Sequence, residues 1–191
     1  MGRVKNSDVT KTWRVFKSIA ALLLGRYRIN RICGLTWASR PLPLPRDVIM
    51  REIDDLASMD GVSPLFRERS WYRGNDAHGF GLFQNEELVC LCWFWGSRRF
   101  NDSLLWTLRE NEAFLMDLLT APEFRGRNFA PLLISLASKE MQRLGHSALY
   151  SSVWYTNRAS LRAFEKAGWR QICVVAEINP LSITRPIRFI W

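Results

Sequence analysis

The sequence has few histidines and cysteines and lacks the signs of a membrane span or a secretory signal. Two histidines and four cysteines occur in 191 residues. Because the cysteines have no paired spacing and the histidines lie far from them, we expect reduced thiols and no metal site. The apolar run at residues 19–24 is too short to span a bilayer. It is followed at once by Arg26 and by no small-residue cleavage site, which argues against a secretory signal.

The composition is that of a folded protein. Hydrophobic residues make up 48% of the chain and charged residues 24%, which argues against intrinsic disorder. The length suits one domain, with or without an appendage, and allows a sizeable core. No internal repeat or low-complexity tract is present.

The net charge of +9 is concentrated near the N-terminus. Residues 1–46 hold ten Lys and Arg against one acid, whereas the other 145 residues hold 17 basic and 17 acidic side chains. Because the body of the chain is neutral, we expect no nucleic-acid partner. The excess charge predicts an adhesive N-terminal segment.

That segment has the pattern of a basic amphipathic helix. In a helical projection of residues 11–28, Trp, Phe, Val, Ile, Leu and Tyr side chains share one broad arc, and most of the Lys and Arg lie opposite. Two interpretations remain open. The helix packs on its own domain or a second subunit of a homodimer, or residues 10–32 attach to a membrane-bound partner or an anionic membrane surface. We therefore expect a cytoplasmic protein, with the inner face of the membrane as an alternative location.

A proline-rich connector at residues 40–48 separates this segment from the body. We divide the chain into residues 1–45, containing the basic helix, a short strand around 29–37 and the connector, and a domain at residues 46–191.

The domain is predicted to alternate helices and strands. Hydrophobic spacing indicates a helix over residues 46–59, a hairpin of strands 78–83 and 88–95, and a further strand at 113–120. A helix at 131–145 and a strand at 148–155 follow. A second helix at 157–168 and two strands at 169–178 and 183–191 complete the order. This order predicts an α/β (α+β) fold, with a mixed sheet and a strand–helix–strand crossover at its centre.

The stretch "APEFRGRNFAPLL" at residues 121–133 places a basic loop at the start of the crossover helix. First-turn amides of a helix have no partner within the helix, so they form an anion site that neighbouring arginines strengthen. Gly126 allows the backbone to approach a ligand closely. The loop is therefore a candidate phosphate site.

Two motifs resemble the signatures of the GNAT superfamily of N-acyltransferases. "MDLLTAPEFRGRNFA" is similar to the family's strand, Pro-x-x-Arg-Gly turn and helix start, and "NRASLRAFEKAGW" is similar to its second signature. They occur in the family's order and spacing, and the resemblance covers roughly residues 46–180. It implies the GNAT fold, with flanking helices and a central sheet splayed apart between the strands at 113–120 and 148–155.

The resemblance also implies that acetyl-CoA is the co-substrate. Backbone groups of Leu118 and Thr120 would pair with the pantetheine arm, and the amide of Leu118 or Leu119 would polarise the thioester carbonyl. The pyrophosphate would bind the loop residues Arg125, Gly126, Arg127, Asn128, Phe129 and Ala130. Asn157, Ser160 and Phe164 would line the opposite side of the cleft.

Three positions depart from the family pattern. Asn128 replaces a glycine, and asparagine tolerates the same left-handed backbone. Phe164 replaces a tyrosine that serves as general acid, so Tyr155 or water would take that role. Met116 replaces a glutamate, which leaves Asp117 and Glu112 as candidate bases. Strand alternation would place these two carboxylates on opposite faces.

The expected function is transfer of an acetyl group to the primary amine of a small molecule, such as an amino sugar or its lipid-linked form. The aromatic residues Trp71, Tyr72, Trp93, Trp95 and Trp106 suit a sugar or an apolar chain. Arg67, Arg69 and Arg73 are candidates for an anionic acceptor group. The alternatives are acetylation of a protein amine, or a non-catalytic domain that binds CoA or a partner.

Overall fold

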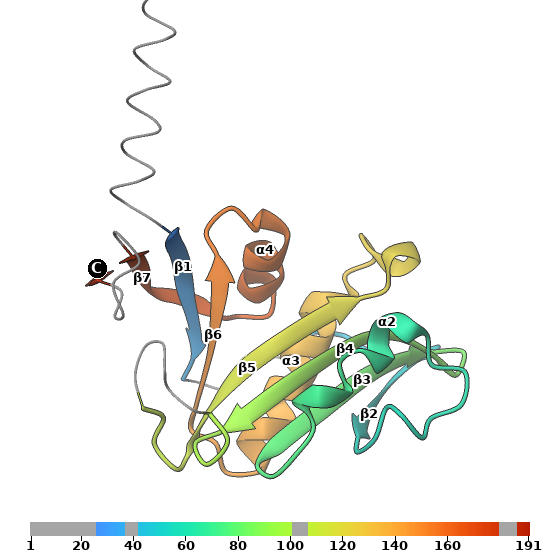
Figure 1. The fold of residues 1–191 in the computed structure, drawn as a ribbon. Coiled ribbons are helices and arrows are strands. Elements are labelled where there is room, and N and C mark those ends of the chain that lie inside the picture. Colours follow the sequence, from blue (N-terminus) through green and yellow to red (C-terminus); the bar gives the residue numbers. More distant parts are fainter. Residues whose placement is uncertain (1–25, 37–41, 101–106, 180–186) are drawn as a thin grey trace, which may run out of the picture.

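A mixed β-sheet forms the centre of the molecule (Figure 1). The computed structural model describes residues 26–36, 42–100, 107–179 and 187–191, so most of the expected amphipathic helix lies outside the described residues. The sheet has the order β2-β3-β4-β5-β6-β1-β7-β8. Its strands are β1 (Arg26–Leu35), β2 (Val48–Ile53), β3 (Ala77–Gln84), β4 (Glu87–Gly96), β5 (Glu112–Thr120), β6 (Ala148–Trp154), β7 (Arg170–Asn179) and β8 (Ile187–Ile190).

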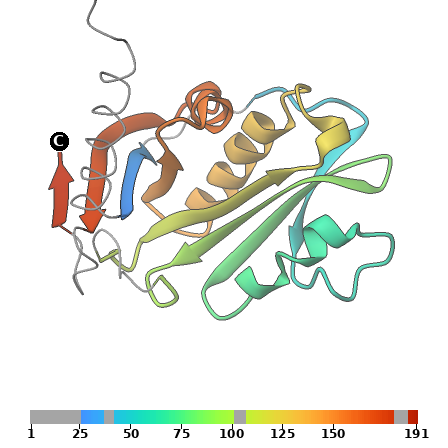
Figure 2. The ribbon, with the colours of Figure 1, turned by 45° about the horizontal axis from the view of Figure 1, so that its top comes forward.

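Helices cover both faces of the sheet, as Figures 1 and 2 show. Helices α3 (Phe129–Arg143) and α4 (Arg158–Lys166) pack on one face, and their side chains share a core with β1, β4 and β6. The short helix α2 (Pro64–Arg67) packs on the other face over a second core, and the 3₁₀ turn η1 (Ser70–Tyr72) follows it. A further 3₁₀ turn, η2 (Pro122–Phe124), connects β5 to α3. No helix within the described residues is long and apolar enough to cross a membrane.

Strands β5 and β6 form a parallel pair that separates halfway along β5. Their register runs from Glu112 opposite Ala148 to Leu115 opposite Ser151, and every other pair of neighbouring strands in the sheet is antiparallel. The Ser151 hydroxyl donates a hydrogen bond to the Leu115 carbonyl at 2.9 Å, at the last paired position. Beyond that point residues 117–120 pair only with β4. The expected mixed sheet and its splay are confirmed.

The predicted helix at residues 46–59 is wrong. Residues 48–53 form strand β2, which pairs with β3. Val48 packs into the core on the α3 face and Ile53 into the core on the α2 face. Because only these two end residues are buried, and on opposite faces, the strand lacks the simple alternation of apolar and polar residues, and its spacing also fits a helix.

Strand β1 confirms the short strand expected near the proline-rich connector, and it is longer at its N-terminal end. It runs antiparallel between β6 and β7. Residues 26–28, expected at the end of the amphipathic helix, therefore belong to a strand. Residues 26–35, which we assigned to the segment before the domain, are part of the domain's sheet.

Candidate functional site

A cleft of about 530 Å³ opens where β5 and β6 separate. Its walls come from the end of β5, the loop that follows, the start of α3, and α4. The lining residues are Leu118, Leu119, Thr120, Phe124, Arg125, Gly126, Asn128, Phe129, Ala130, Pro131, Asn157, Ala159, Ser160, Arg162, Ala163 and Lys166. The cleft therefore brings together the two sequence motifs, which lie about thirty residues apart in the chain.

The start of α3 presents backbone amides to this cleft. Gly126 and Asn128 both have positive φ angles, of 80° and 62°. Within the described part of the chain, none of the amides at residues 126–130 donates a hydrogen bond to a carbonyl or a side chain. The Asn128 side chain does not cap the helix. The loop thus holds several unpaired N–H groups at the positive end of a helix dipole, which is the arrangement that binds anions.

Asn128 connects the two walls of the cleft. Its amide oxygen accepts a hydrogen bond of 2.7 Å from the Lys166 ammonium on α4. The Asn128 side chain is therefore held against α4 rather than extending alone into the cleft. It positions the Lys166 ammonium beside the unpaired amides at the start of α3. The left-handed backbone at this position is one that asparagine adopts more readily than most residues.

The charge of the lining is positive. Arg125, Arg162 and Lys166 line the cleft, and no Asp or Glu does so among the described residues. Arg125 donates from Nε to the Thr120 carbonyl at 3.3 Å, which ties the loop to the end of β5. Such a site favours a ligand with more than one negative charge.

The α4 wall begins at Asn157, whose side-chain oxygen accepts a 3.1 Å hydrogen bond from the Ser160 amide. Both residues belong to the second motif and were predicted, whereas Ala159, Arg162, Ala163 and Lys166 on the same helix were not. Their spacing of three, four and seven residues marks one helical face. That signal was available in the sequence, as was the proximity of Phe124 and Pro131 to the basic loop.

Five residues expected at the site do not line the cleft: Phe164, Arg127, Tyr155, Asp117 and Glu112. Phe164 is only 2% exposed and packs in the core with its ring 4.9 Å from that of Trp169. Arg127 places its guanidinium 5.1 Å from the Phe124 ring centre. Tyr155 follows β6, lies exposed beside Trp154, and donates its backbone amide to the Ile29 carbonyl.

Asp117 lies on the face of the sheet that carries α2. Its Oδ2 atom is 3.1 Å from Nε of Arg69, but the N–H is not aimed at it. Among the described residues no donor forms a hydrogen bond to this buried oxygen. Burial raises the pKa of Asp117, and the Arg69 charge opposes that shift. Burial, with the charge of Asp117, also raises the pKa of Tyr72.

A bulge in β5 corrects the expected alternation. The pairing with β4 shifts so that Asp117 lies opposite Trp93 and Phe114 lies opposite Trp95, with Met116 as the extra residue. Asp117 and Phe114 therefore face the same side, contrary to the prediction from strict alternation, because a bulge inverts the phase of the strand beyond it.

Glu112 shares that face but lies at the opposite end of β5. Its carboxylate accepts a hydrogen bond from the Arg109 amide at 3.0 Å and lies 3.4 Å from the Tyr150 hydroxyl. These contacts support the turn into β5 rather than the cleft at its other end.

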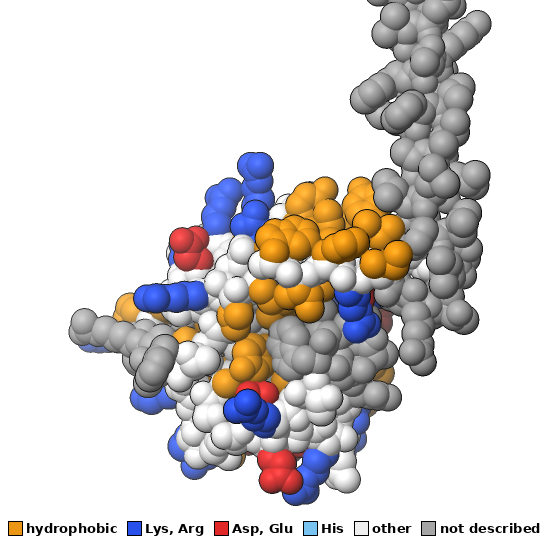
Figure 3. Space-filling model, turned by 90° about the vertical axis from the view of Figure 1, so that its left-hand side faces the viewer, with side chains coloured by type: hydrophobic (Ala, Val, Ile, Leu, Met, Phe, Trp, Pro, Cys, Tyr) orange, Lys and Arg blue, Asp and Glu red, His pale blue; other side chains and the backbone are white. Residues whose placement is uncertain are grey.

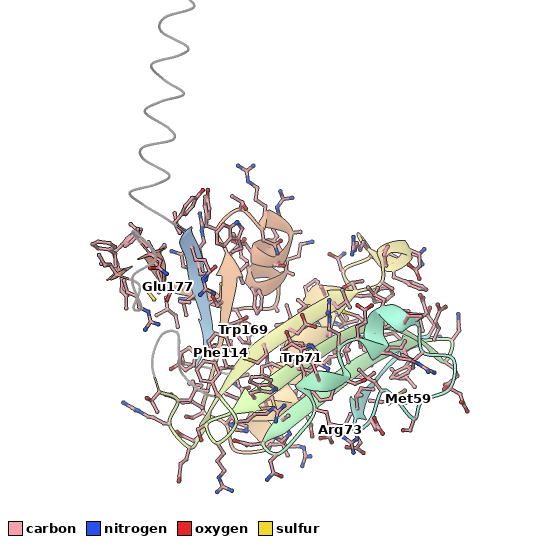
Figure 4. The ribbon with its side chains drawn as sticks, viewed as in Figure 1. Met59, Trp71, Arg73, Phe114, Trp169 and Glu177 are labelled. Carbon is pink, nitrogen blue, oxygen red and sulfur yellow. The ribbon has the colours of Figure 1, made fainter. Side chains whose placement is uncertain are left out.

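An aromatic wall stands beside Asp117. Trp71 stacks on Tyr72 with ring centres 3.8 Å apart, and Trp95 contacts both rings. Figure 4 shows Trp71 over the β4–β5 pair, and its side chain is 58% exposed. Trp95 also donates its indole N–H to the Tyr72 carbonyl and packs against the Arg99 guanidinium. Trp106 lies outside the described residues.

The arginines proposed for an anionic acceptor group have structural contacts instead. Arg67 donates to the carbonyls of Val62 and Met59, and Arg73 pairs with Asp55 at 3.3 Å. Arg69 pairs with Asp117, as described above.

The cysteines are poor candidates for nucleophiles. Burial raises the pKa of Cys33 to about 11 and that of Cys90 to about 12, so both stay protonated near neutral pH. Across the described ranges, no cluster of three or more His, Cys, Asp or Glu residues could hold a metal ion.

Comparisons with known proteins agree with this arrangement. The family model described as "Acetyltransferase (GNAT) family" matches residues 47–169. No curated protein sequence gives a significant match.

Among solved structures, the chain resembles a GNAT-family protein from Novosphingobium aromaticivorans, with 18% identity and a TM-score of 0.53 over 81% of this chain and 64% of that one. A GCN5-related N-acetyltransferase from Sphaerobacter thermophilus has 13% identity and a TM-score of 0.55 over 88% and 56%. A tandem GNAT protein from the clavulanic acid biosynthesis pathway has 11% identity and a TM-score of 0.55 over 83% and 55%. The chain thus spans between 55 and 64% of the length of these proteins, and at such identities the likeness concerns the fold.

Proposed function

Because the chain belongs to the acetyltransferase (GNAT) family, we propose that it transfers an acetyl group from coenzyme A to the primary amine of a small molecule. The observation that carries this proposal is the set of unpaired amides at residues 126–130, which open into a basic cleft without acidic lining.

These groups fit the diphosphate of coenzyme A. A diphosphate carries at least two negative charges and accepts hydrogen bonds on every side, so it matches backbone N–H groups, the α3 dipole and nearby cations. Gly126 adds to the fit because nothing lies within 4 Å of where its Cβ would be. A ligand can therefore approach the backbone at this point.

The open edge of β5 fits the pantetheine arm. Residues 117–120 pair with β4 along one edge only, and Leu118, Leu119 and Thr120 line the cleft. An extended amide-containing chain can add to such an edge as an extra strand. The amide of Leu118 or Leu119 would then donate to the thioester carbonyl oxygen and stabilise the charge that develops there.

Asp117 is the group best suited to take the proton from the acceptor. An amine must be neutral to attack, and a partly buried carboxylate with a raised pKa and an unpaired oxygen is a suitable base. The amine nitrogen bonds to the carbonyl carbon, the C–S bond breaks, and the departing thiolate takes a proton from water. Tyr155 pairs with β1 through its backbone amide and Glu112 supports the turn into β5, so neither has a place in this scheme.

The aromatic wall of Trp71, Tyr72 and Trp95 suits an acceptor with a flat or apolar face, such as the ring of an amino sugar. It lies on the same side of β5 as Asp117, so an acceptor ring stacked there would present its amine toward the carboxylate.

Thiol release from acetyl-CoA with a panel of amines tests this function. We expect turnover with at least one small amine, and a decrease of about 10²-fold or more in kcat/KM for Asp117→Asn. Glu87→Gln, at the exposed β3–β4 hairpin, serves as the matched control.

Tight CoA binding without thiol release for any amine would contradict the proposal and favour a non-catalytic domain. Turnover only with peptides that carry a free N-terminus or lysine would assign the chain to protein acetylation.

A further inference from the structure

Exposed apolar side chains gather at one end of the sheet. Of the twelve large hydrophobic residues that are exposed in the described chain, eight lie on β1, β7, β8 or the end of β6. They are Tyr27, Trp154, Tyr155, Ile172, Ile187, Phe189, Ile190 and Trp191, which we call the edge surface. Figure 3 shows hydrophobic side chains crowded over this part of the molecule, with arginine or lysine beside them.

The strand register places these residues in rows on the two faces of the sheet, which meet at its end. Tyr27 lies opposite Ile178, which lies opposite Ile187, and the next row of this face ends at Phe189. On the other face of the sheet, one row runs from Trp154 through Val175 to Ile190. All four residues of β8, the last strand in the sheet, are exposed, and Trp191 after it is 67% exposed.

The net positive charge of the sequence comes from the segments that include the strands of the edge surface. Residues 42–147, from β2 through α3, have 12 basic and 15 acidic side chains, which gives a net charge of −3. Residues 1–41 and 148–191 have 15 basic and three acidic side chains, which gives +12.

Of these three acids, Glu177 is buried and contacts two arginines, Arg28 at 3.3 Å and Arg188 at 2.8 Å. The edge surface is therefore both apolar and strongly basic.

We propose that the edge surface binds the interface of an anionic phospholipid bilayer. Tryptophan, tyrosine and phenylalanine suit the headgroup level of a membrane, and basic residues nearby are attracted to anionic lipids. This inference does not depend on the proposed acetyl transfer, because none of the eight residues of the edge surface lines the cleft.

The positive charge around the edge surface favours anionic lipid over two other binding partners, residues 1–25 of the same chain and a second copy of the chain. Residues 1–25 directly precede Arg26, the first residue of β1. They carry five basic residues and one acid, so they repel the surface electrostatically. A second copy of the chain would bring the same positive charge to the contact. Anionic lipid complements both the apolar and the basic character, and residues 1–25 then add their charge to the same interaction.

Vesicle flotation of the full-length chain tests the proposal. We expect the protein to float with vesicles of phosphatidylcholine mixed with phosphatidylglycerol, and not with phosphatidylcholine alone. High salt should weaken the binding, because it screens the attraction. The double variant Phe189→Ser, Trp191→Ser should bind about 10-fold more weakly. The matched control, Ile49→Ser with Leu144→Ser, removes two exposed apolar residues elsewhere and should float like the parent.

Three results would overturn the inference. The first is flotation that is absent or equal with both kinds of vesicle. The second is a dimer in sedimentation experiments that the Phe189→Ser, Trp191→Ser variant abolishes, since this would assign the surface to a second copy. The third is stronger flotation of a chain that begins at Arg26, since this would show that residues 1–25 cover the surface. Circular dichroism of each variant verifies that the fold is retained.

Discussion

At the scale of the residue, Asn128 combines two properties that a glycine could not supply together. Its backbone adopts φ of 62°, and its side chain holds Lys166 across the cleft. We expect Lys166→Met to raise the KM for acetyl-CoA about 10-fold, because a charge-assisted contact with the diphosphate is lost. Asn128→Gly keeps the backbone conformation and frees the lysine, so the KM should rise less. Initial-rate kinetics should show kcat changed less than twofold.

The contribution of the diphosphate to binding can be measured apart from that of the rest of acetyl-CoA. The KM for acetyl-pantetheine, which has no diphosphate, should be insensitive to Lys166→Met. In a variant that combines Asn128→Gly with Lys166→Met, the two increases in the KM for acetyl-CoA should not add, because both substitutions act on one contact. Lys139→Met, at an exposed position of α3, is the control. An unchanged KM for acetyl-CoA in Lys166→Met would show that the Asn128 contact only joins α3 to α4.

Asp117 gives a pH-dependence with a definite sign. Burial raises the pKa of this carboxyl, and only the ionised form can accept a proton from the amine. The value of kcat/KM should therefore fall as the pH decreases through that raised pKa. Arg69→Gln removes the charge that opposes the shift, so the acidic limb of the profile should move to higher pH. If the limb stays in place in Arg69→Gln, another group controls it.

At the scale of the element, local sequence patterns predicted the helices that bury one face. They did not predict features that depend on strands distant in the sequence. The helix at α3 and the helix at α4 were predictable because each has an apolar face and a terminating glycine, Gly145 and Gly168. Strand β2 was not predictable, because its two buried end residues pack into two different cores. The bulge at Met116 was also beyond prediction, since it depends on the register with β4.

Helix α4 can be destabilised at its N-cap residue, Asn157, without a change in the residues that pack against the core. Asn157→Ala removes the acceptor for the Ser160 amide, which should lower the free energy of unfolding by about 1 kcal/mol in urea titrations. Asn157→Asp keeps the cap, so stability should be retained. Its new negative charge faces the cleft, and we expect weaker CoA binding by calorimetry. Equal stability of Asn157→Ala and the parent would show that the cap contributes nothing.

At the scale of the whole molecule, the candidate site depends on a strand that comes from outside the two motifs. Residues 26–35 lie between β6 and β7, so the two strands that flank the α4 wall of the cleft in the chain are joined in the sheet by β1. The sequence indicated a strand near this position and could not indicate its neighbours, because pairing between residues more than a hundred positions apart leaves no local signal. The motifs, in contrast, located the basic loop and the Asn157 cap correctly because their chemistry is local.

The position of β1 predicts two very different truncations. A chain that begins at Arg26 keeps every described strand and should unfold cooperatively, with a free energy of unfolding close to that of the full chain. A chain that begins at Trp37 leaves facing edges of β6 and β7 unpaired, so it should fail to fold. Ile32→Ala in the full chain tests the same point more gently. Ile32 is fully buried, and its truncation should cost about 2–5 kcal/mol in urea titrations. Cooperative unfolding of the chain from Trp37, at the stability of the parent, would mean that β1 is dispensable to the sheet.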